Sequence, residues 1–335
     1  MPRWLVSAAV RRALICSLTA ALVLVPAASA SAANRWIQKK APLNIAHQGG
    51  EDEFPSNTMY AFRKALRAGA DMLELDIGVT RDNKVIVMHD TTVDGKTNGH
   101  GTVSSKTLRQ MRRLDAAYWF APRAADHYSH DLARRAYRFR GIATGRKAPP
   151  RGFTRADFRV PTLAQVVKAF PRTPINVEIK GRTPAEGIEE YVKNAEVLAS
   201  LLNGTKHRKL IVVSFKQAAV DRFHELVPNI GLAPGIDGAA GYLLGGGSPG
   251  DGVVAFQVPI TFQFGGSLLD ITTPDNVARA HRDGYAWQNW FSNDDRDAPA
   301  TWRSLIDMCV DGTMTSRPVA YERVLRHHSR PAACS

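Results

Sequence analysis

Short apolar runs alternate with longer amphipathic stretches along most of this chain. Nine of the apolar runs have the length and the side-chain types of β-strands. They cover residues 43–46, 72–79, 85–89, 175–179, 210–215, 230–233, 253–258, 285–290 and 310–315. Stretches with helical periodicity lie between most of them, among them 57–68, 163–170, 187–202 and 274–282. Strands that alternate with helices favour an α/β fold with a parallel sheet.

One of the nine runs does not fit a parallel arrangement. Only residues 80–84 separate the second run from the third, and a parallel crossover needs about a dozen residues or more. We therefore predict a hairpin that turns around Asp82 and Asn83 and brings His89 roughly opposite Asp76. The other eight runs predict a (β/α)8 TIM barrel, for which a chain of 335 residues is long enough.

A long insertion, at about residues 114–159, separates the hairpin from the third barrel strand. It contains ten Arg or Lys residues and four Asp residues, with several aromatic residues among them. Loops at the carboxyl ends of barrel strands overhang the active face. The insertion is therefore predicted to be either a basic, aromatic lid over an anionic substrate or an ordinary solvated subdomain.

Three carboxylates fall on two neighbouring strands of the predicted barrel. Alternation places Glu74 and Asp76 on one face of the second strand, and Glu178 and Lys180 on one face of the third. Carboxylates inside an apolar strand repel each other and are costly to bury, so a positive group should lie between them. Oxygen-only ligands suit a hard divalent cation, and we favour Ca²⁺ over Mg²⁺ because its coordination is more forgiving.

Two histidines complete a candidate catalytic site. His47 ends the first strand and is followed by Gly49 and Gly50, whereas His89 ends the hairpin. Two histidines at the barrel rim suit a proton donor and a proton acceptor on either side of a reacting group, and Lys180 supplies a fixed positive charge for an anion. A single strand-end histidine is more often structural, but the combination fits phosphodiester hydrolysis.

At this point the chain resembles the glycerophosphodiester phosphodiesterases, a family of phospholipase-C-like TIM-barrel phosphodiesterases. The similarity extends over nearly the whole chain after residue 32. It is carried by the segments IAHQGG, PSNT, AGADMLELDIGVTRDNKVIVMHD, NGHGTV, PTLAQVVKAFPRTPINVEIK, VVSF, YAWQNW and VDGTMTSRP. The resemblance implies a barrel fold and hydrolysis of glycerophosphodiesters.

The resemblance also implies roles for individual residues. His47 and His89 match the acid/base pair of the family, without an assignment of which is the acid. The matched metal ligands are Glu74, Asp76 and Glu178. The matched substrate-binding residues are Lys180, which contacts the phosphate, and Trp287, together with Gln48 in place of the usual arginine.

Three positions depart from the family pattern. The usual His-Arg pair is His47-Gln48, and the usual Pro-Glu-Asn-Thr has Ser56 in place of Glu. The Arg-Thr-Thr after the second histidine reads Gly95-Lys96-Thr97. Gln48 retains an amide that can hydrogen-bond to a phosphate oxygen, so these changes bear on the head group more than on the reaction class.

Three functions remain open at this level. The leading hypothesis is metal-dependent hydrolysis of a glycerophosphodiester to an alcohol and glycerol 3-phosphate. A second is lysophospholipase D activity on lysophospholipids, which needs an apolar groove. Candidate groove residues are Phe256, Val258, Ile260, Phe262 and Phe264. A third is a basic envelope-binding protein on a barrel whose catalytic function has decayed, against which the intact histidines and carboxylates argue.

The N-terminal segment is typical of an exported protein. Residues 1–32 combine early arginines, an apolar run at 13–25 and a series of small residues, which predicts a signal peptide and a secreted, periplasmic or envelope location. Residues 33–335 then form the single barrel domain. Cys309 and Cys334 are the cysteines outside the predicted signal peptide, and a disulfide between them is plausible in an oxidising compartment.

The charge of the chain bears on its partners. The formal net charge is +13, and because residues 1–32 carry three Arg and no acidic residue, the remainder carries +10. A basic exported protein suits anionic small molecules or an anionic envelope surface. We expect no nucleic-acid partner, because no stacking-aromatic module of that kind is present.

Overall fold

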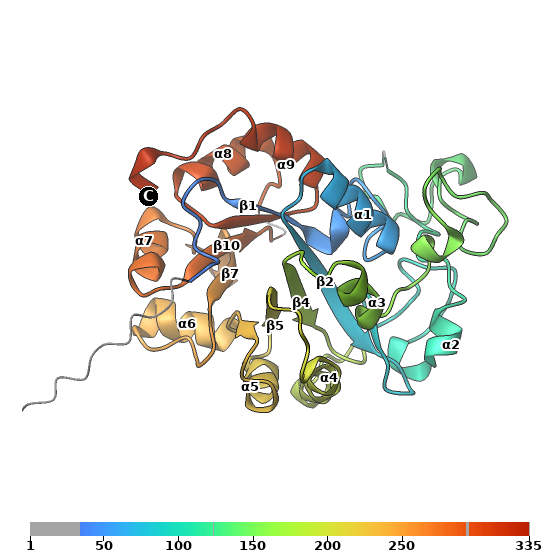
Figure 1. Cartoon of the computed structure of the whole chain (residues 1–335), viewed down its shortest axis with the longest axis horizontal. Coiled ribbons are helices and arrows are strands. Elements are labelled where there is room, and N and C mark those ends of the chain that lie inside the picture. The colour runs from blue at the N-terminus through green and yellow to red at the C-terminus, as the bar shows by residue number, and fades with distance from the viewer. Residues whose placement is uncertain (1–33, 123, 293–294, 335) are drawn as a thin grey trace, which may run out of the picture. The chain divides into compact units, whose positions relative to one another are not determined.

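A computed structural model describes residues 34–122, 124–292 and 295–334, so the predicted signal peptide lies outside the described residues. Eight parallel strands of the described chain form a nearly closed barrel, which confirms the predicted TIM fold (Figure 1). In chain order they are β1 (Leu43–Ala46), β2 (Met72–Val79), β4 (Ile175–Ile179), β5 (Leu210–Val213), β6 (Gly231–Leu232), β7 (Ala255–Pro259), β10 (Ala286–Trp290) and β11 (Gly312–Thr315). A single parallel bridge between Leu232 and Val253 closes the seam between β6 and β7.

Helices surround these strands, one after each strand or its insertion (Figure 1). They are α1 (Met59–Ala68), α3 (Leu163–Ala169), α4 (Ile188–Leu202), α5 (Gln217–Leu226), α6 (Ile236–Gly245), α7 (Pro274–Arg282), α8 (Pro299–Asp307) and α9 (Pro318–Leu325). Local signals fix several helix starts: Thr58 and Thr273 accept hydrogen bonds from N3 amides, and α7, α8 and α9 begin with proline. No helix in the described parts is both long and apolar enough to cross a bilayer.

The alternation of side chains along each strand separates two environments. Leu73, Leu75 and Ile77 of β2 point outward and pack with the helices. Near the amino ends of the strands, the inward-facing side chains form an apolar layer that includes Met72 and Ala286. A polar layer follows, in which the Gln257 amide donates to Asn176 (3.0 Å) and to Gln288 (2.9 Å). The carboxylates lie above it, towards the carboxyl ends of the strands.

The predicted hairpin after the second strand is confirmed. β3 (Val85–Val87) pairs antiparallel with β2, in the register Ile77↔Val87 and Val79↔Val85. The turn contains Asn83 in a left-handed conformation (φ 52°). The Met88 amide donates to the Asp76 carbonyl (2.9 Å), so His89 leaves the hairpin beside the buried carboxylates.

A second hairpin was not predicted. β8 (Thr261–Phe264) and β9 (Ser267–Asp270) form a separate two-stranded sheet between β7 and α7. Gly265 and Gly266 connect them with positive φ angles, as a tight two-residue hairpin turn requires. The Gly-Gly pair between two apolar runs was the sequence signal for this element.

The basic insertion forms its own aromatic cluster. Within its described residues the regular structure consists of short 3-10 turns, η3 (Arg134–Ala136) and η4 (Arg155–Phe158), after the 3-10 turn η2 (Val103–Ser105) and the short helix α2 (Leu108–Met111). The Arg140 guanidinium lies over the rings of Tyr118 (4.2 Å), Trp119 (4.4 Å) and Tyr137 (3.8 Å). Most of these aromatic residues therefore stabilise the insertion itself rather than forming an open surface.

The predicted disulfide between Cys309 and Cys334 is present and fastens the C-terminal tail to the amino end of the barrel. The tail also places Arg330, whose side chain is 1% exposed, at 3.6 Å from the buried carboxylate of Asp311. The guanidinium donates to the carbonyls of Gln38 and Cys309. Asp311 also accepts hydrogen bonds from the backbone amides of Gln38 and Trp287 (both 2.7 Å).

Replacing Cys334 by serine is expected to lower the free energy of unfolding by about 3 kcal/mol, because the bond closes a loop of 25 residues that would otherwise be free in the unfolded chain. Urea denaturation of the variant beside the oxidised wild type measures the change, and the reduced wild type should behave like the variant. Turnover below the melting temperature should be unaffected, because the bond lies at the end of the barrel opposite the carboxylates. An unchanged midpoint would contradict the prediction.

Candidate active site

Three carboxylates meet at the carboxyl end of the barrel, as predicted. Glu74 and Asp76 extend inward from β2, and Glu178 extends inward from β4, where it pairs in register with Asp76. One oxygen from each of the three residues lies within 4.8 Å of the others. Glu74 and Asp76 are 1% and 0% exposed, so water does little to reduce their repulsion.

Lys180 supplies the nearest positive charge. Its ammonium lies 2.7 Å from Glu178 Oε1 and 3.4 Å from Asp76 Oδ1. Burial lowers the pKa of Lys180, but the adjacent charges of Glu178, Asp76 and Glu74 outweigh burial and raise it, so the side chain is charged. The formal charge of the four residues together is −2.

The loop after β1 holds Glu74 and Asp76 in place. The backbone N–H of Gln48 donates to Glu74 Oε2 (2.7 Å), and the Asn57 side chain donates to Asp76 Oδ2 (2.9 Å). The Asn57 amide group also approaches Gln48 Oε1 (3.3 Å). Gln48 is 2% exposed, and in this structure it supports the carboxylates. Its contact with a phosphate stays a prediction.

Burial and the neighbouring charge of Asp76 raise the pKa of Glu74 well above its ordinary value. Burial acts in the same direction on Asp76, but His89, Lys180, His47 and the Asn57 amide outweigh it and lower the pKa of Asp76. The two carboxylates of β2 thus have pKa values shifted apart. Such a divergence is expected where like charges are forced together in a buried site.

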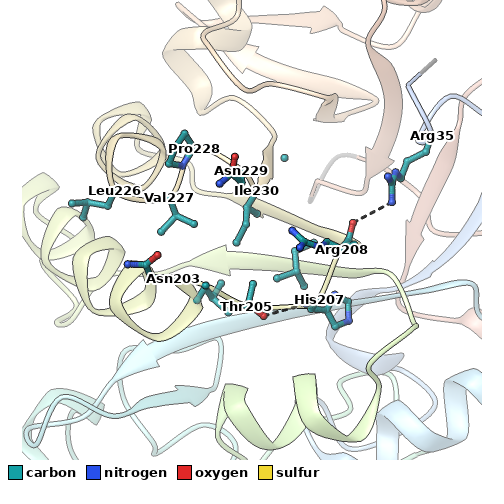
Figure 2. Close-up of a pocket in the computed structure, with 14 residues that line it drawn as sticks. Arg35, Asn203, Thr205, His207, Arg208, Leu226, Val227, Pro228, Asn229 and Ile230 are labelled. Atoms are coloured by element: carbon teal, nitrogen blue, oxygen red, sulfur yellow. Dashed lines mark hydrogen bonds between the residues drawn. The ribbon is translucent and has the colours of Figure 1, made fainter. Parts of the chain in front are cut away.

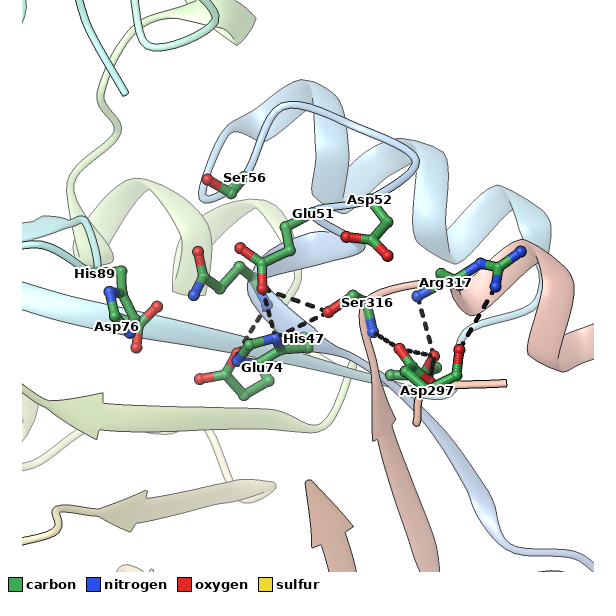
Figure 3. A network of polar contacts seen from close by, with 12 residues as sticks. His47, Glu51, Asp52, Ser56, Glu74, Asp76, His89, Asp297, Ser316 and Arg317 are labelled. Carbon is green, nitrogen blue, oxygen red and sulfur yellow. Dashed lines mark hydrogen bonds and ion pairs between the residues drawn. The ribbon is translucent and has the colours of Figure 1, made fainter. Parts of the chain in front are cut away.

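His47 lies at the end of β1 with its ring held between acidic groups (Figure 3). Nδ1 is 2.9 Å from Glu51 Oε1 and 3.3 Å from Ser316 Oγ, and Nε2 is 3.9 Å from Glu74 Oε2. Burial lowers the pKa of His47, but the charges of Glu51, Glu74 and Asp76 outweigh it and raise the pKa to about 10. A hydrogen bond from Nδ1 to Glu51 leaves Nε2 directed towards the carboxylate cluster.

His89 is held in a similar way beside Asp76 (Figure 3). Its Nδ1 lies 2.8 Å from Asp90 Oδ1, and Nε2 remains available for a proton transfer. Burial lowers the pKa of His89, whereas Asp76 and Asp90 raise it, and the net shift is upward. The structure therefore brings both predicted histidines to the three carboxylates and gives each an acidic partner on Nδ1.

The residues present fit a divalent cation. Asp76 Oδ1 is buried and accepts no hydrogen bond from any described residue, and Lys180 is 3.4 Å away. The donor set consists of carboxylate oxygens, which hard divalent cations prefer. One such ion would also balance the formal charge of −2. Glu74, Asp76 and Glu178 would hold it.

Glu51, Asp90 and Asn57 belong to the site but were not predicted. Glu51 follows His47 by four residues and Asp90 follows His89 directly, so an acidic residue near each histidine was the available signal. Asn57 gave no comparable signal. Ser316 was also missed; its amide donates to Asp297 (2.8 Å), which holds its hydroxyl beside His47 (Figure 3).

A polar chain connects the insertion to His47. Tyr128 of the insertion accepts a hydrogen bond from the Ser56 amide (2.6 Å) and donates to the Ser56 hydroxyl (2.9 Å). The Lys96 ammonium lies 3.7 Å from the centre of the Tyr128 ring and 3.5 Å from Glu51 Oε2. Glu51 in turn contacts His47. The insertion therefore contributes one aromatic side chain to the surroundings of the site.

The predicted substrate contact of Trp287 is wrong for this structure. Trp287 is completely buried on the outer face of β10, packs with Phe256 and donates its indole N–H to Thr272 (3.1 Å). The inward positions of β10 are Ala286, Gln288 and Trp290, because side chains alternate along a strand. Trp290 therefore takes the inner position, and its indole N–H donates to the Gln257 carbonyl (3.2 Å).

An apolar groove begins next to Lys180. The Lys180 ammonium lies 5.4 Å from the centre of the Phe215 ring, and this ring stacks on Trp290 (5.5 Å between centroids). From this pair the groove passes between α6 and the β8–β9 hairpin, and its lining includes Ala240, Leu243, Phe262 and Leu269.

The five residues that the sequence suggested for an apolar groove do not all line the groove of the structure. Val258 and Phe262 line the groove, whereas Phe256 lies in the core and Ile260 packs against that core. The side chain of Phe264 lies outside the described ones.

A separate cleft of about 460 Å³ lies at the amino ends of β5 and β6 (Figure 2). It is lined by the carboxyl ends of α4 and α5, and Arg35 donates to the Arg208 carbonyl there (3.2 Å). No carboxylate is among its lining residues in the described chain. Barrel enzymes carry their chemistry at the opposite face, so this cleft is not the candidate active site.

The sequence of this chain is similar to those of known proteins. The family model described as the glycerophosphoryl diester phosphodiesterase family matches residues 47–320. A putative glycerophosphodiester phosphodiesterase of Bacillus subtilis is 34% identical over 190 residues, which are 56% of this chain and 63% of that protein. A lysophospholipase D of Rattus norvegicus is 33% identical over 141 residues, 41% of this chain and 36% of that protein. The chain thus spans less than two thirds of either relative.

A solved structure has the same fold. The structure of an Oleispira antarctica phosphodiesterase in complex with the product sn-glycerol-3-phosphate has a TM-score of 0.58 and 18% identity, and the comparison covers 85% of this chain and 97% of that one. The family match begins at His47 and includes both histidines, the three carboxylates and Lys180. The chain therefore belongs to the glycerophosphoryl diester phosphodiesterase family.

Proposed function

We propose that this protein hydrolyses glycerophosphodiesters to an alcohol and glycerol 3-phosphate, with a divalent cation held by Glu74, Asp76 and Glu178. The observation that carries the proposal is the meeting of oxygens from three carboxylates within 4.8 Å, two of them buried, beside one lysine and two histidines. Family membership and the product bound to the Oleispira antarctica phosphodiesterase support the same reaction. When bound, the cation would supply electrostatic stabilisation of the phosphate oxygens.

The side chains of the site suit the two proton transfers of phosphodiester cleavage. In the first step one histidine takes the proton of the attacking glycerol 2-hydroxyl and the other gives a proton to the departing alkoxide, which leaves a cyclic glycerol phosphate. Water then opens this ring to glycerol 3-phosphate, with the two histidines exchanging roles. Glu51 and Asp90 hold the Nδ1 atoms, which supports Nε2 of His47 and of His89 as the atoms that would transfer protons. Lys180 is near enough to the carboxylates to contact a phosphate oxygen bound there.

We favour Ca²⁺ as the cation and export as the fate of the chain. A cluster of carboxylates from two adjacent strands suits an ion with flexible coordination. The charged, apolar and small-residue segments within residues 1–32 support export. The alternative of an envelope-binding protein on a decayed barrel is disfavoured, because a site without function has no reason to keep a cation-binding cluster and two oriented histidines together.

Lysophospholipids are a second candidate substrate class, and the apolar groove specifically favours them. The groove begins at Phe215, whose ring lies 5.4 Å from the Lys180 ammonium, and it continues between α6 and the β8–β9 hairpin. A lysophospholipid has one phosphodiester and one acyl chain. With its phosphodiester at Lys180, the chain would enter the groove and remove apolar surface from water.

Chelation of divalent cations should abolish turnover and lower the melting temperature, because a ligand bound to the folded state stabilises it by mass action. Asp76→Asn should weaken cation binding while keeping the side-chain shape, whereas Asp94→Asn, at an exposed ion pair with His100, serves as the control. Isothermal titration with Ca²⁺ and with Mg²⁺ measures the affinities and tests the preference. Full turnover in excess chelator with unchanged melting would refute the metal-dependent reaction.

Replacing His47 or His89 by alanine is expected to reduce turnover of glycerophosphocholine by roughly 10²–10⁴-fold, the usual contribution of one general acid or base. Affinity for the cation should change little, because neither histidine is a proposed ligand. His100→Ala, at an exposed histidine, is the control. A single variant with nearly wild-type turnover would remove that histidine from the mechanism.

Filling the groove should separate the two substrate classes. Ala240→Phe places a large ring among the groove residues and should reduce turnover of lysophosphatidylcholine at least about tenfold, through the lost burial of the acyl chain. Turnover of glycerophosphocholine, which has no acyl chain, should stay within about twofold, and Ala278→Phe on an exposed position of α7 should alter neither. Equal losses on both substrates would show that the groove does not hold the acyl chain.

A further inference from the structure

The mouth of the apolar groove has an unusual concentration of exposed apolar side chains. Among the described residues, seven large hydrophobic side chains are exposed. Three of them line the groove: Phe215 (40% exposed), Ile236 (42%) and Leu244 (66%). A fourth, Leu268 (53%), lies on the β8–β9 hairpin. These four residues are called the apolar rim below.

The hairpin carries an exposed leucine on the face opposite the groove. Its pairing sets Phe262 opposite Leu269 and Gln263 opposite Leu268. Phe262 and Leu269 line the groove, so alternation places Leu268 on the other face of the hairpin. The other residues of that face, Thr261, Gln263 and Asp270, are polar. The hairpin therefore presents Leu268 to solvent on the face opposite the groove.

Few charges lie on α6 and the β8–β9 hairpin, which carry three of the four rim residues. Charged residues make up 22% of the whole chain. By contrast, residues 236–245 contain one charged residue, Asp237, and residues 261–270 contain one, Asp270. Helix α6 is also weakly anchored, because Tyr242 is its single buried residue in the described chain. Low charge and high apolar exposure lower the cost of moving this surface out of water.

The groove connects the rim to the candidate active site. At its inner end, Phe215 stacks on Trp290 and lies beside Lys180. At its outer end it opens between Leu244 and the hairpin. An amphiphile with its phosphodiester at the carboxylates would extend its chain along this path, so the rim lies where the chain leaves the protein.

We propose that the apolar rim docks on a lipid surface, a membrane or a micelle, and takes an amphiphilic substrate from it through the groove. This inference rests on the proposed lysophospholipid activity for its purpose, but docking itself requires no turnover. Leu244 and Leu268 enter the acyl region, Ile236 and Phe215 border the groove, and the substrate chain passes from lipid to protein without crossing water. Surfaces of this kind bind in proportion to the apolar area that they bury.

The test compares two matched double variants. Leu244→Glu with Leu268→Glu places charges on the rim, and Ile188→Glu with Leu201→Glu places them on exposed positions of α4 (58% and 39% exposed). Co-sedimentation with vesicles of phosphatidylcholine and lysophosphatidylcholine measures docking. The rim variant should bind at least about tenfold more weakly than the wild type, because two apolar side chains no longer enter the lipid, and the α4 variant should bind like the wild type.

Turnover of glycerophosphocholine, which is freely soluble, shows that each variant is folded and active. Leu268→Glu alone, whose side chain does not line the groove, should retain it within about twofold but lose turnover of vesicle-bound lysophosphatidylcholine. If the rim variant unfolds, Leu244→Ser with Leu268→Ser replaces it. A wild type that does not bind vesicles, or equal losses in the rim and α4 variants, would overturn the proposal. Vesicle binding without turnover of any diester would instead overturn the proposed function and leave docking intact.

Discussion

Mutual repulsion of three carboxylates, two of them fully buried, is the constraint around which the rest of the site is arranged. Each carboxylate has one principal polar partner. The partner is the backbone N–H of Gln48 for Glu74, the Asn57 side chain for Asp76, and the Lys180 ammonium for Glu178. Gln48 and Asn57 both have left-handed backbone conformations (φ 49° and 55°), which are unfavourable for residues other than glycine. The loop after β1 therefore keeps local strain in order to direct polar groups at the carboxylates.

The same negative charges determine the state of the histidines. Glu74 and Asp76 contribute to the raised pKa of His47, and Asp76 contributes to that of His89. A divalent cation among the carboxylates opposes this effect, because it neutralises the charges that hold the extra protons. Cation binding and protonation of the histidines are consequently linked. The same geometry would therefore govern both the proposed cation affinity and the proposed acid/base pair.

The sequence predicted the features that follow from periodicity and chain length. Eight barrel strands, the β2–β3 hairpin and the shared strand faces of Glu74 with Asp76 and of Glu178 with Lys180 all come from alternation and from the short connection at residues 80–84. The choice between Trp287 and Trp290 could not be made in this way. Alternation says that they face opposite sides, but the neighbouring strands decide which side is inside. Contacts made by loops, such as Asn57 with Asp76, likewise depend on tertiary folding.

The three departures from the family pattern are connected in space. Ser56 is held by Tyr128 of the insertion, Tyr128 lies under the Lys96 ammonium, and Lys96 pairs with Glu51. Glu51 then holds His47, whose neighbour Gln48 supports Glu74. An arginine at position 48 and a glutamate at position 56 would bring opposite charges to this region. Their absence removes one charge of each sign, and the local balance instead includes Lys96 and Glu51. The insertion, for which the sequence left two roles open, thus contacts the altered segments through Tyr128 and through His130, whose Nε2 lies 3.3 Å from the Gly95 carbonyl oxygen.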